Sequence, residues 1–526
     1  MARHSFFRGT VILIAAGFMT KILGFIPNIV LPRIIGAEGV GLFRMAFPVL
    51  LLVITLTTFG LPVAISKLVA EAEAKKDYNK IKSVLRISIF IVIGLSILFT
   101  ILMFAFAPFI SKYLLTDQRA YYPLLAITPI IPIIAISSVL RGYFQGRQNM
   151  TPSALSSLIE TIVRILTVIF FALYMRPFGI EYAATAAMLG VVVGEFFGML
   201  VLIYQFRRAK KRNLIPYTGS LFQKVKRNRI QLLEIGRIAI PVTTSRLAGN
   251  VFYVIEPVVV AQSLAYAGFS VATATSLYGE LSGMAIPLVF IPTFLTYSLS
   301  VSLVPAISEA AAQKKYGLIQ RRLSQSLRLT LVMCAPFAVT MYVFAVPVST
   351  ILYDQPQVGH LLQVLAPFSL FLYFQAPLAA TLQGLDRAKE AMRNTIIGAA
   401  IKTIAIFLLA SQPVFGIDGV AMAINVGIVL VTLFHFFSLV KLIGFTIEAR
   451  TFVKVGIAMI IMGYSGSYFM TNWLDDWGLF LSLLAAVFVS ILVYILLLVS
   501  MKVLGRQDVV RIPWIGEQLA PFFPKR

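Results

Sequence analysis

The sequence is poor in the residues that catalysis and metal binding require. Its 526 residues include one cysteine, Cys334, and three scattered histidines, His4, His360 and His435. A single cysteine excludes a disulfide within the chain, and the histidines lack the spacing of metal ligands. No Walker loop is present, and three isolated histidines do not form a serine–histidine–acid set. The sequence therefore predicts neither an enzyme nor a bound metal or cofactor.

Charge is also scarce. Only 13% of the residues are charged, 59% are hydrophobic, and the mean hydropathy is +0.90, whereas about a quarter of the residues of a soluble globular chain are charged. On a soluble protein the net charge of +24 would suggest a nucleic-acid partner. Here the basic residues cluster in short loops between apolar segments, so we expect a membrane protein with no nucleic-acid partner.

Apolar runs of about 20 residues or more, each long enough to span a bilayer, predict an all-α integral membrane protein. The first run continues past Ala15 and Ala16 to Pro32, which is too long for a cleavable signal segment. The fourteen predicted transmembrane helices are 8–32, 42–70, 84–111, 121–146, 152–175, 181–206, 232–264, 274–311, 323–352, 359–384, 390–412, 417–441, 453–473 and 478–502.

The loops between these helices alternate in charge. One set is strongly basic, as in RRAKKR at 207–212 and KVKRNR at 224–229, and the other is nearly free of basic residues, as in YAGFS at 266–270. Basic loops stay in the cytoplasm. We therefore expect a multi-pass protein of the cell membrane with both termini in the cytoplasm and an even number of helices.

The chain also repeats itself. Three matched pairs of segments recur at the nearly constant offsets 242, 238 and 237 along the numbering: LPVAISKLVAEAEAKKDY at 61–78 with VPAISEAAAQKKY at 304–316, FQG at 144–146 with LQG at 382–384, and FGIEYAA at 178–184 with FGIDGVA at 415–421. Six helices per repeat is an even number, which predicts two halves of the same orientation, a parallel repeat.

This repeat predicts the domain organisation. The N-terminal six-helix half is residues 1–206, a basic cytoplasmic linker is 207–229, and the C-terminal six-helix half is 230–442. Residues 443–526 hold two appended helices and a cytoplasmic tail. Within the halves, the prolines of TPIIPII and IPLVFIPTF predict bends, because each proline removes a backbone donor.

Ionisable residues inside the predicted helices are costly and usually face a cavity or a partner. They are Lys21, Glu160, Arg164, Glu195, Arg246, Glu256, Glu280 and Lys402, and Arg33 and Arg44 flank a predicted GAEGVG turn at 36–41. We predict that Lys21, Arg246, Glu256 and Glu280 line a central water-filled cavity. Glu280 lies in the small-residue run ATATSLYGELSG, which would let helix backbones approach closely.

The remaining charges leave alternatives open. Glu160 and Arg164 are spaced to pair on one helix face, so they are either a structural pair or coupling charges. Glu195 either packs against another helix or binds a ligand, and Arg33 and Arg44 are either interfacial anchors or substrate contacts. Lys402 aligns with Arg164 at the 238 offset, but Gly398 replaces Glu160.

Four long segments carry a family resemblance: TKILGFIPNIVLPRIIGAEGVGLF at 20–43, FGLPVAISKLVAEA at 59–72, LLAITPIIPIIAISSVLRGYFQGRQNMTP at 124–152 and SRLAGNVFYVIEPVVVAQSL at 245–264. They resemble the polysaccharide-transporter branch of the multidrug/oligosaccharidyl-lipid/polysaccharide flippase superfamily over essentially the whole chain. The resemblance implies a V-shaped bundle that exports an undecaprenyl-pyrophosphate-linked glycan by alternating access. It further implies that the glycan is the peptidoglycan precursor lipid II, for spore cortex synthesis.

The resemblance also implies a substrate site. Related lipid II flippases face the substrate pyrophosphate with basic residues in helices one, two and eight, and Lys21 takes the place of a cavity arginine in their Ser-Arg-x-Leu-Gly-Phe motif. Their following arginine-aspartate is Pro27 and Asn28 here. Arg44 falls near the helix-two arginine, and Glu280 near the helix-eight arginine with opposite charge. The predicted substrate-binding residues are Lys21, Arg33, Arg44, Arg246, Glu256 and Glu280.

Two other functions fit the same residues. One is a cation-coupled exporter of amphipathic drugs, with Glu256 and Glu280 as the proton or sodium site. The other is a non-transporting scaffold that recruits wall-synthesis enzymes through its basic loops. Two helices beyond the repeat favour a lipid-linked oligosaccharide as the partner.

Overall fold

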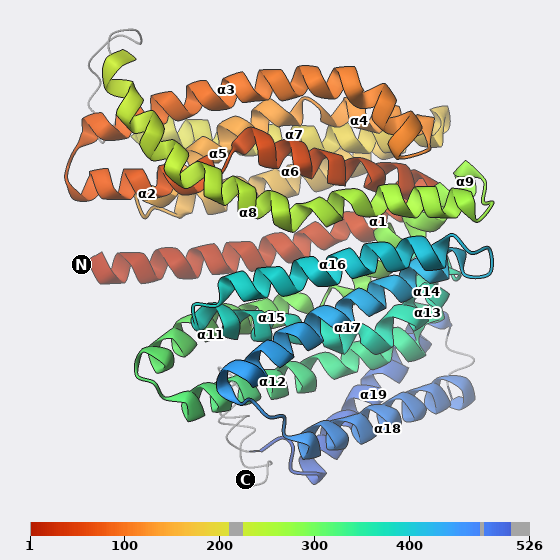
Figure 1. Cartoon of the computed structure of the whole chain (residues 1–526). Helices are drawn as coiled ribbons and strands as arrows, with labels where there is room; N and C mark the ends of the chain where they lie inside the picture. The colour runs from red at the N-terminus through yellow and green to blue at the C-terminus, as the bar shows by residue number, and fades with distance from the viewer. Residues whose placement is uncertain (1, 210–224, 474–477, 506–526) are drawn as a thin grey trace. The chain divides into compact units, whose positions relative to one another are not determined.

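The computed structural model describes residues 2–209, 225–473 and 478–505, and these are helical almost throughout, with no strand among them (Figure 1). Twelve of the described helices are long and apolar enough to cross a membrane, and a bent pair, Gln231–Thr244 and Gly249–Tyr266, makes thirteen if it counts as one span. The first of the twelve, Ile22–Ala74, covers two of the predicted helices. The protein is a multi-pass membrane protein of the all-helical class that the sequence predicts.

The chain forms two compact units, Met1–Gly283 and Met284–Arg526. The helices of the first unit are α1 (Ala2–Thr58), α2 (Leu61–Ala74), α3 (Tyr78–Phe109), η1 (Ile110–Leu114), η2 (Gln118–Ala120), α4 (Tyr121–Ile127), α5 (Ile130–Gly146), α6 (Thr151–Met175), η3 (Arg176–Phe178), α7 (Ile180–Ala209), α8 (Val225–Tyr266) and α9 (Val271–Tyr278). The π-helical turn η5 (Gly279–Ala285) follows α9 and spans the division between the units.

The second unit continues from there. Its helices are α10 (Ile286–Val289), α11 (Thr293–Ala312), α12 (Tyr316–Val343), α13 (Ala345–Tyr353), α14 (Val358–Leu365), η6 (Ala366–Phe368), α15 (Ser369–Gly384), α16 (Ala388–Ala410), α17 (Gly416–Ile443), α18 (Ala449–Trp473) and α19 (Leu479–Ser500).

The predicted GAEGVG turn is wrong in extent. Only Gly36 departs from helical geometry, with φ 69° and ψ −179°, and the chain is helical again from Ala37 onward. A positive φ is accessible to glycine because it has no Cβ. The helix predicted at 8–32 and the first part of the one predicted at 42–70 are therefore joined in α1 by a break at a single residue rather than by a turn that spans 36–41. The predicted helix 42–70 is itself interrupted at Phe59 and Gly60, both with a left-handed φ, and continues as α2.

Several predicted spans are interrupted, chiefly at the prolines. The predicted helix 121–146 breaks between α4 and α5, where Pro129 precedes the first residue of α5. The predicted helix 274–311 is four pieces, α9, η5, α10 and α11, and Pro292 is the residue before α11. At the start of a helix the missing N–H of proline costs no hydrogen bond, because the first N–H groups have no acceptor within the helix. Inside a helix, proline removes one of the backbone hydrogen bonds. The helices are thus interrupted at TPIIPII and at IPLVFIPTF, the two motifs whose prolines predict a departure from a straight helix.

The backbone supports the internal duplication through its turns. Lys76 and Lys314 match at the 238 offset and both have a left-handed φ, 55° and 53°; Gln148 and Asp386 form a second such pair at the same offset, with φ 55° and 60°. Non-glycine residues adopt this conformation infrequently. The structural correspondence at the first pair is thus 238, slightly less than the offset 242 of the sequence match there.

The packing of the helices repeats at the same interval. A Cβ on Gly146 would lie 2.6 Å from the Ser66 carbonyl oxygen, and a Cβ on Gly384 would lie 2.9 Å from that of Val304. Each glycine lets the last turn of one helix touch the backbone of another: α5 touches α2, and α15 touches α11. All four positions obey the 238 interval, so the two halves share helix contacts as well as turns.

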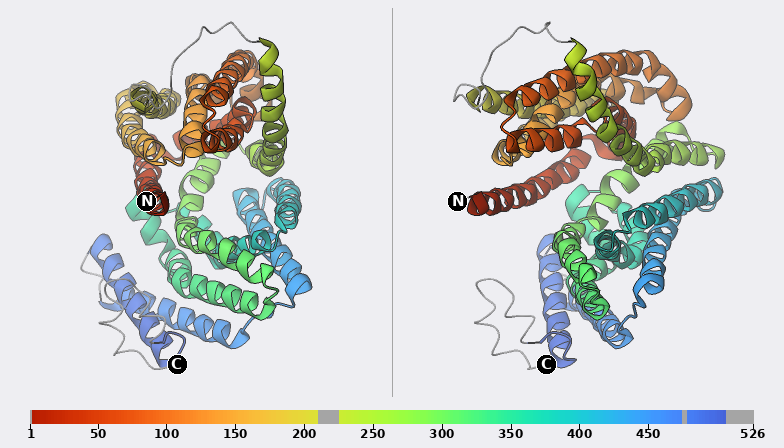
Figure 2. Two further views of the ribbon diagram at one scale, coloured as in Figure 1. Left: turned by 90° about the vertical axis from the view of Figure 1, so that its left-hand side faces the viewer. Right: turned by 60° about the vertical axis from the view of Figure 1, so that its left-hand side comes forward.

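The appended helices α18 and α19 belong to the second unit. They lie side by side in both views of Figure 2. The Tyr494 hydroxyl donates to the Val332 carbonyl of α12 at 3.1 Å, and the Lys454 ammonium donates to the Met501 carbonyl at 2.6 Å. A buried apolar cluster that includes Leu331, Met462 and Leu498 completes this interface.

Candidate functional site

The site is built where α1 meets α9 and η5 at backbone contact. A Cβ on Gly41 would lie 2.0 Å from the Thr275 carbonyl oxygen, and one on Gly279 would lie 1.9 Å from the Ala37 carbonyl oxygen. Only glycine fits at such distances. The small-residue run that contains Glu280 therefore lets the helix backbones approach closely, as the sequence predicts. The glycines of GAEGVG allow the same approach on the α1 side.

Arg44 and Glu256 both lie near the same two tyrosines at this junction. The Arg44 guanidinium donates to the Asn28 side-chain oxygen at 2.7 Å, a contact between two parts of α1 on either side of Gly36. Glu256 comes from α8, and its charge and that of Arg44 both act on the phenols of Tyr253 and Tyr278. The structure thus brings together two of the predicted substrate-binding residues, from helices far apart in the sequence.

Tyr278 and η5 form the buried side of this cluster. Tyr278 is 6% exposed, and the Ser282 hydroxyl lies beside its phenol. Glu280 is 8% exposed, in the first turn of η5, and a Cβ on Gly283 would lie 3.7 Å from the Arg44 side chain. Single π-helical turns inside α-helices are frequent at functional sites. The turn η5 therefore lies along Arg44 and holds Glu280 within the protein interior.

The other predicted substrate residues lie along the same helices. The backbone of Lys21 is part of α1, but its side chain lies outside the described residues. Arg33 is exposed on α1. Arg246 is exposed on α8, at the 41° bend between Thr244 and Gly249, and no described contact places it in the cluster. The structure therefore places Arg44 and Glu256 near the same two tyrosines and Glu280 in the turn η5 that lies along Arg44. No described contact brings Arg246 to this group.

A second charged group joins three helices of the first unit. Arg164 pairs with Glu160 at 3.1 Å, as their i, i+4 spacing predicts. Arg141 of α5 pairs with Glu160 at 2.9 Å and with Glu195 of α7 at 3.3 Å. Both carboxylates are buried. Glu195 has no oppositely charged neighbour in the sequence, and its ion-pair partner is Arg141.

Glycines of α7 allow this network to form. A Cβ on Gly194 would lie 2.6 Å from the Arg164 side chain, and one on Gly198 would lie 3.0 Å from that of Glu160. In the second unit the stem of Lys402 lies against Gly427 in the same way, at 2.8 Å from a Cβ there. Lys402 and Arg164, which align at the 238 offset, therefore each pack against a glycine of the following helix, although Gly427 and Gly194 are 233 residues apart.

A third polar group fixes the α1–α9 junction at its other end. Arg119 pairs with Asp117 at 2.9 Å and with Glu38 of α1 at 2.6 Å. The Thr275 hydroxyl of α9 donates to Asp117 at 2.8 Å, and Asp117 is 1% exposed. This group ties η2, α1 and α9 together beside the backbone contact of Gly41.

Sequence reasoning missed Asn28 as a partner, Arg141, Tyr253 and Tyr278. Neutral side chains such as Asn28 and the two tyrosines raise no signal in a search for charge. Arg141 is the one charged residue of α5 (IIPIIAISSVLRGYFQG). A search for every charged residue within each apolar segment would therefore have identified it. Among the described residues there is no group of three or more histidine, cysteine, aspartate or glutamate side chains that could hold a metal.

Ionisable side chains held between the helices of a membrane-spanning bundle are typical of a secondary transporter. Solved structures show the fold. The chain is similar to "Lipid II flippase MurJ, inward closed conformation" with a TM-score of 0.69, at 17% identity over 95% of this chain and 100% of that one. It is also similar to an inward-facing multidrug resistance MATE family transporter of the MOP superfamily, with a TM-score of 0.66, at 16% identity over 81% and 94% of the two chains.

The family follows from the sequence comparisons. Residues 6–311 match the model of the polysaccharide biosynthesis protein family, and the chain belongs to this family; residues 280–408 match the MatE family. Stage V sporulation protein B of Bacillus subtilis (strain 168) is 44% identical over 98% of this chain and 99% of its own length. Lipid II flippase MurJ of the same organism is 26% identical over 86% of each chain.

Proposed function

We propose that this protein is a flippase of a lipid-linked glycan, the undecaprenyl-pyrophosphate-linked peptidoglycan unit lipid II, and that it works by alternating access in the cell membrane. Similarity to a lipid II flippase and to a stage V sporulation protein supports this proposal and the further proposal of a role in spore cortex synthesis. The single observation that carries it within the molecule is the half-buried Arg44, which Asn28 holds beside η5.

The chemistry of this cluster suits a pyrophosphate. A guanidinium offers several donors in a fixed plane and forms strong charge-assisted hydrogen bonds with phosphate oxygens. In a site of lowered dielectric each cation attracts a phosphate more strongly than in water, so few cations are needed. Lys21 and Arg33 share α1 with Arg44, and together they would supply the positive charge. The carboxylates of Glu256 and Glu280 would balance that charge when no substrate is bound.

The test is reconstitution. Purified protein in liposomes would be given labelled lipid II or a simpler polyprenyl-linked sugar, with and without an ion gradient. We expect transport of lipid II and its loss in Lys21→Ala and Lys21→Glu, while both variants still insert into the membrane. Arg450→Ala, which removes an exposed cation from the start of α18, is the matched control. Full flipping by both Lys21 variants would overturn the site assignment.

A second candidate function is a cation-coupled exporter of amphipathic drugs. It is favoured by the proximity of Glu256 to Arg44 and of Glu280 to the same junction, and by the match of residues 280–408 to the MatE family. In the same liposomes this function predicts transport of an amphipathic dye that depends on a proton or sodium gradient and is lost in Glu256→Gln. Transport of lipid II without dye transport would exclude it.

A further inference from the structure

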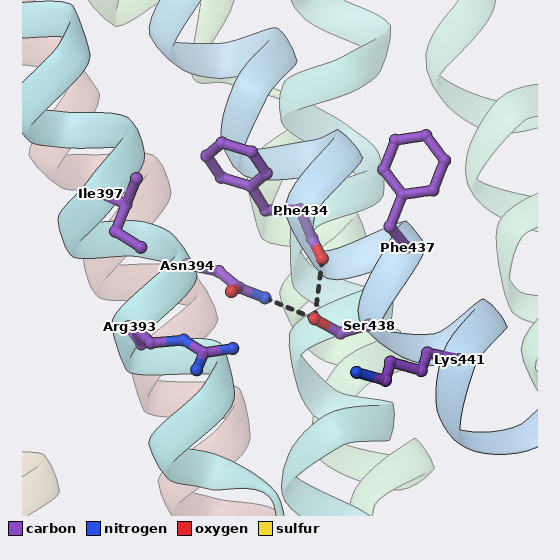
Figure 3. Close-up of a pocket in the computed structure, with 7 residues that line it drawn as sticks. All are labelled: Arg393, Asn394, Ile397, Phe434, Phe437, Ser438 and Lys441. Carbon is purple, nitrogen blue, oxygen red and sulfur yellow. Dashed lines mark hydrogen bonds between the residues drawn. The ribbon is translucent and has the colours of Figure 1, made fainter.

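An open groove lies between α16 and α17, on the side of the second unit where α16 begins and α17 ends. Its volume is about 420 Å³, and Figure 3 shows the seven residues that line it: Arg393, Asn394, Ile397, Phe434, Phe437, Ser438 and Lys441. The polar residues and the apolar residues are separated along the helices. Arg393 and Lys441 are nearest the helix ends, and Ile397 and Phe434 lie one to two turns further into the helices.

The two cations of this groove face one another. Figure 3 shows the Arg393 guanidinium and the Lys441 ammonium extending toward the space between the helices. Both side chains are exposed, and within the described residues neither pairs with a carboxylate. Other cations of the molecule do pair, as Arg387 does with Glu390. Two like charges across a gap repel each other, and an anion between them removes the repulsion.

The floor of the groove is polar and fixed. Asn394 is 5% exposed, and its side-chain amide donates to the Ser438 hydroxyl at 2.9 Å. That hydroxyl in turn donates to the Phe434 carbonyl at 2.9 Å. The first of these hydrogen bonds joins α16 to α17 under the two cations, and the second fixes the Ser438 hydroxyl within α17.

The wall of the groove is apolar and open. Phe437 is 58% exposed and Ile397 is 43% exposed. Exposed apolar side chains on a transmembrane helix are normal where the helix meets hydrocarbon, and basic side chains near the helix ends reach the headgroup level. A ligand that fills this groove therefore needs a negative head beside Arg393 and Lys441 and a hydrocarbon part beside Phe437.

We propose that this groove binds an anionic phospholipid, with the headgroup phosphodiester between Arg393 and Lys441 and one acyl chain along Ile397 and Phe437. The charge of the groove selects an anionic over a zwitterionic headgroup, as basic pockets between transmembrane helices do. The matching helix pair of the first half packs without these cations, because Leu155 of α6 and Ile203 of α7 stand at the positions that match Arg393 and Lys441 at the 238 offset. The groove shares no residue with the proposed glycan site, and this proposal does not depend on that one.

Native mass spectrometry of the full chain tests the proposal. The protein would be purified in mild detergent with equal amounts of phosphatidylglycerol and phosphatidylcholine of the same acyl composition. We expect the protein to retain phosphatidylglycerol preferentially and the double variant Arg393→Gln/Lys441→Gln to lose about thirtyfold in that preference, because each cation near a membrane surface contributes about a factor of five. Unchanged thermal unfolding of the variant in phosphatidylcholine would show that it folds.

The control is Lys389→Gln/Arg450→Gln, which removes two exposed cations that do not line the groove. It should keep the preference; an equal loss in the control and the groove variant would overturn the proposal, since the effect would then be general surface charge. Two competition experiments distinguish an anionic phospholipid from other ligands that carry phosphate. The proposal would be overturned if inorganic phosphate displaced phosphatidylglycerol. It would also be overturned if the protein retained undecaprenyl pyrophosphate more tightly than phosphatidylglycerol and the groove variant lost that retention. Failure of both compounds to compete supports the proposal.

Discussion

Arg44 is positioned by a neutral group. Asn28 offers an amide oxygen, which fixes the guanidinium at 2.7 Å without carrying a charge of its own. A hydrogen bond from a charged donor such as this guanidinium contributes about 1.5 to 3 kcal/mol net. The guanidinium is therefore held in place by an interaction that a pyrophosphate, with its full negative charge, can outcompete or share.

Substitutions at Arg44 should distinguish the contribution of its positive charge from that of its planar hydrogen-bond donors. We expect Arg44→Gln to lower the transport of lipid II at least tenfold, since it removes a cation from a site of lowered dielectric. Arg44→Lys should retain part of the activity, because the charge remains while the planar donors are lost. The measurement is initial flipping rate against lipid II density in liposomes. Equal rates for Arg44→Gln and the parent protein would contradict a role for Arg44 in binding.

Three helices of the first unit are joined by the charges of Arg141, Glu160, Glu195 and Arg164. Removal of one partner from such a group leaves buried carboxylates that face each other without sufficient compensation, whereas replacing the whole group with neutral residues of similar size is close to neutral. The network therefore holds α5, α6 and α7 in one arrangement, with the glycines of α7 letting the helices approach.

We expect Arg141→Ala to lower the free energy of unfolding by about 2 to 4 kcal/mol, less than the largest effects of this type because Arg141 is partly exposed. The triple variant Arg141→Met/Glu160→Gln/Glu195→Gln should recover most of that loss. Thermal unfolding in detergent measures both. A single variant as stable as the parent, or a triple variant no better than the single one, would show that the pairs do not couple these helices.

Contact between α1 and α9 depends on glycine. Gly41→Ala would place a methyl group 2.0 Å from the Thr275 carbonyl oxygen, so the helices must separate, at a cost of about 1 to 3 kcal/mol. Gly94→Ala is the matched control, because a Cβ at Gly94 of α3 meets nothing within 4 Å and alanine favours a helix. We expect a lower unfolding temperature for Gly41→Ala and no decrease for Gly94→Ala; equal behaviour of the two would contradict the close approach.

At the scale of the whole molecule, the distribution of basic loops predicts an orientation in the membrane. Tyr266 precedes a loop with no basic residue, whereas Lys315 lies in a basic loop, and both side chains are exposed. Since basic loops stay in the cytoplasm, these two positions should lie on opposite sides of the membrane, with Lys315 inside.

Cysteine labelling in intact cells measures this orientation. In a Cys334→Ala background, Tyr266→Cys should react with a membrane-impermeant maleimide from outside. Lys315→Cys should react only after the cells are permeabilised. The reverse pattern would place both termini outside, and labelling of both positions in intact cells would indicate a mixed population.

The sequence predicts the helices well because a bilayer demands long apolar runs, and it predicts the Glu160–Arg164 pair because that spacing makes about one helical turn. It does not predict contacts that depend on tertiary packing. Arg141 and Glu195 lie on α5 and α7 with the whole of α6 between them in the chain, and Arg44 and Glu256 come from different helices. The extent of the break at Gly36 also follows from packing, since the small residues after it stay helical where they meet α9 and η5. The functional roles of all the predicted site residues stay predictions: Lys21, Arg33, Arg44, Arg246, Glu256 and Glu280 in substrate binding, and Glu160, Arg164, Glu195 and Lys402 as structural or coupling charges.

The turns at Lys76 and Lys314, and those at Gln148 and Asp386, share backbone geometry while the helices beside them carry different side chains. Within a duplicated chain, such turns are interchangeable parts, whereas residues such as Glu160 and its counterpart Gly398 are not. Each half has therefore been free to change its chemistry without changing its scaffold. A chimaera that exchanges residues 75–77 with 313–315 should fold and function, and this tolerance would give protein engineers fixed joints at which whole helices can be replaced.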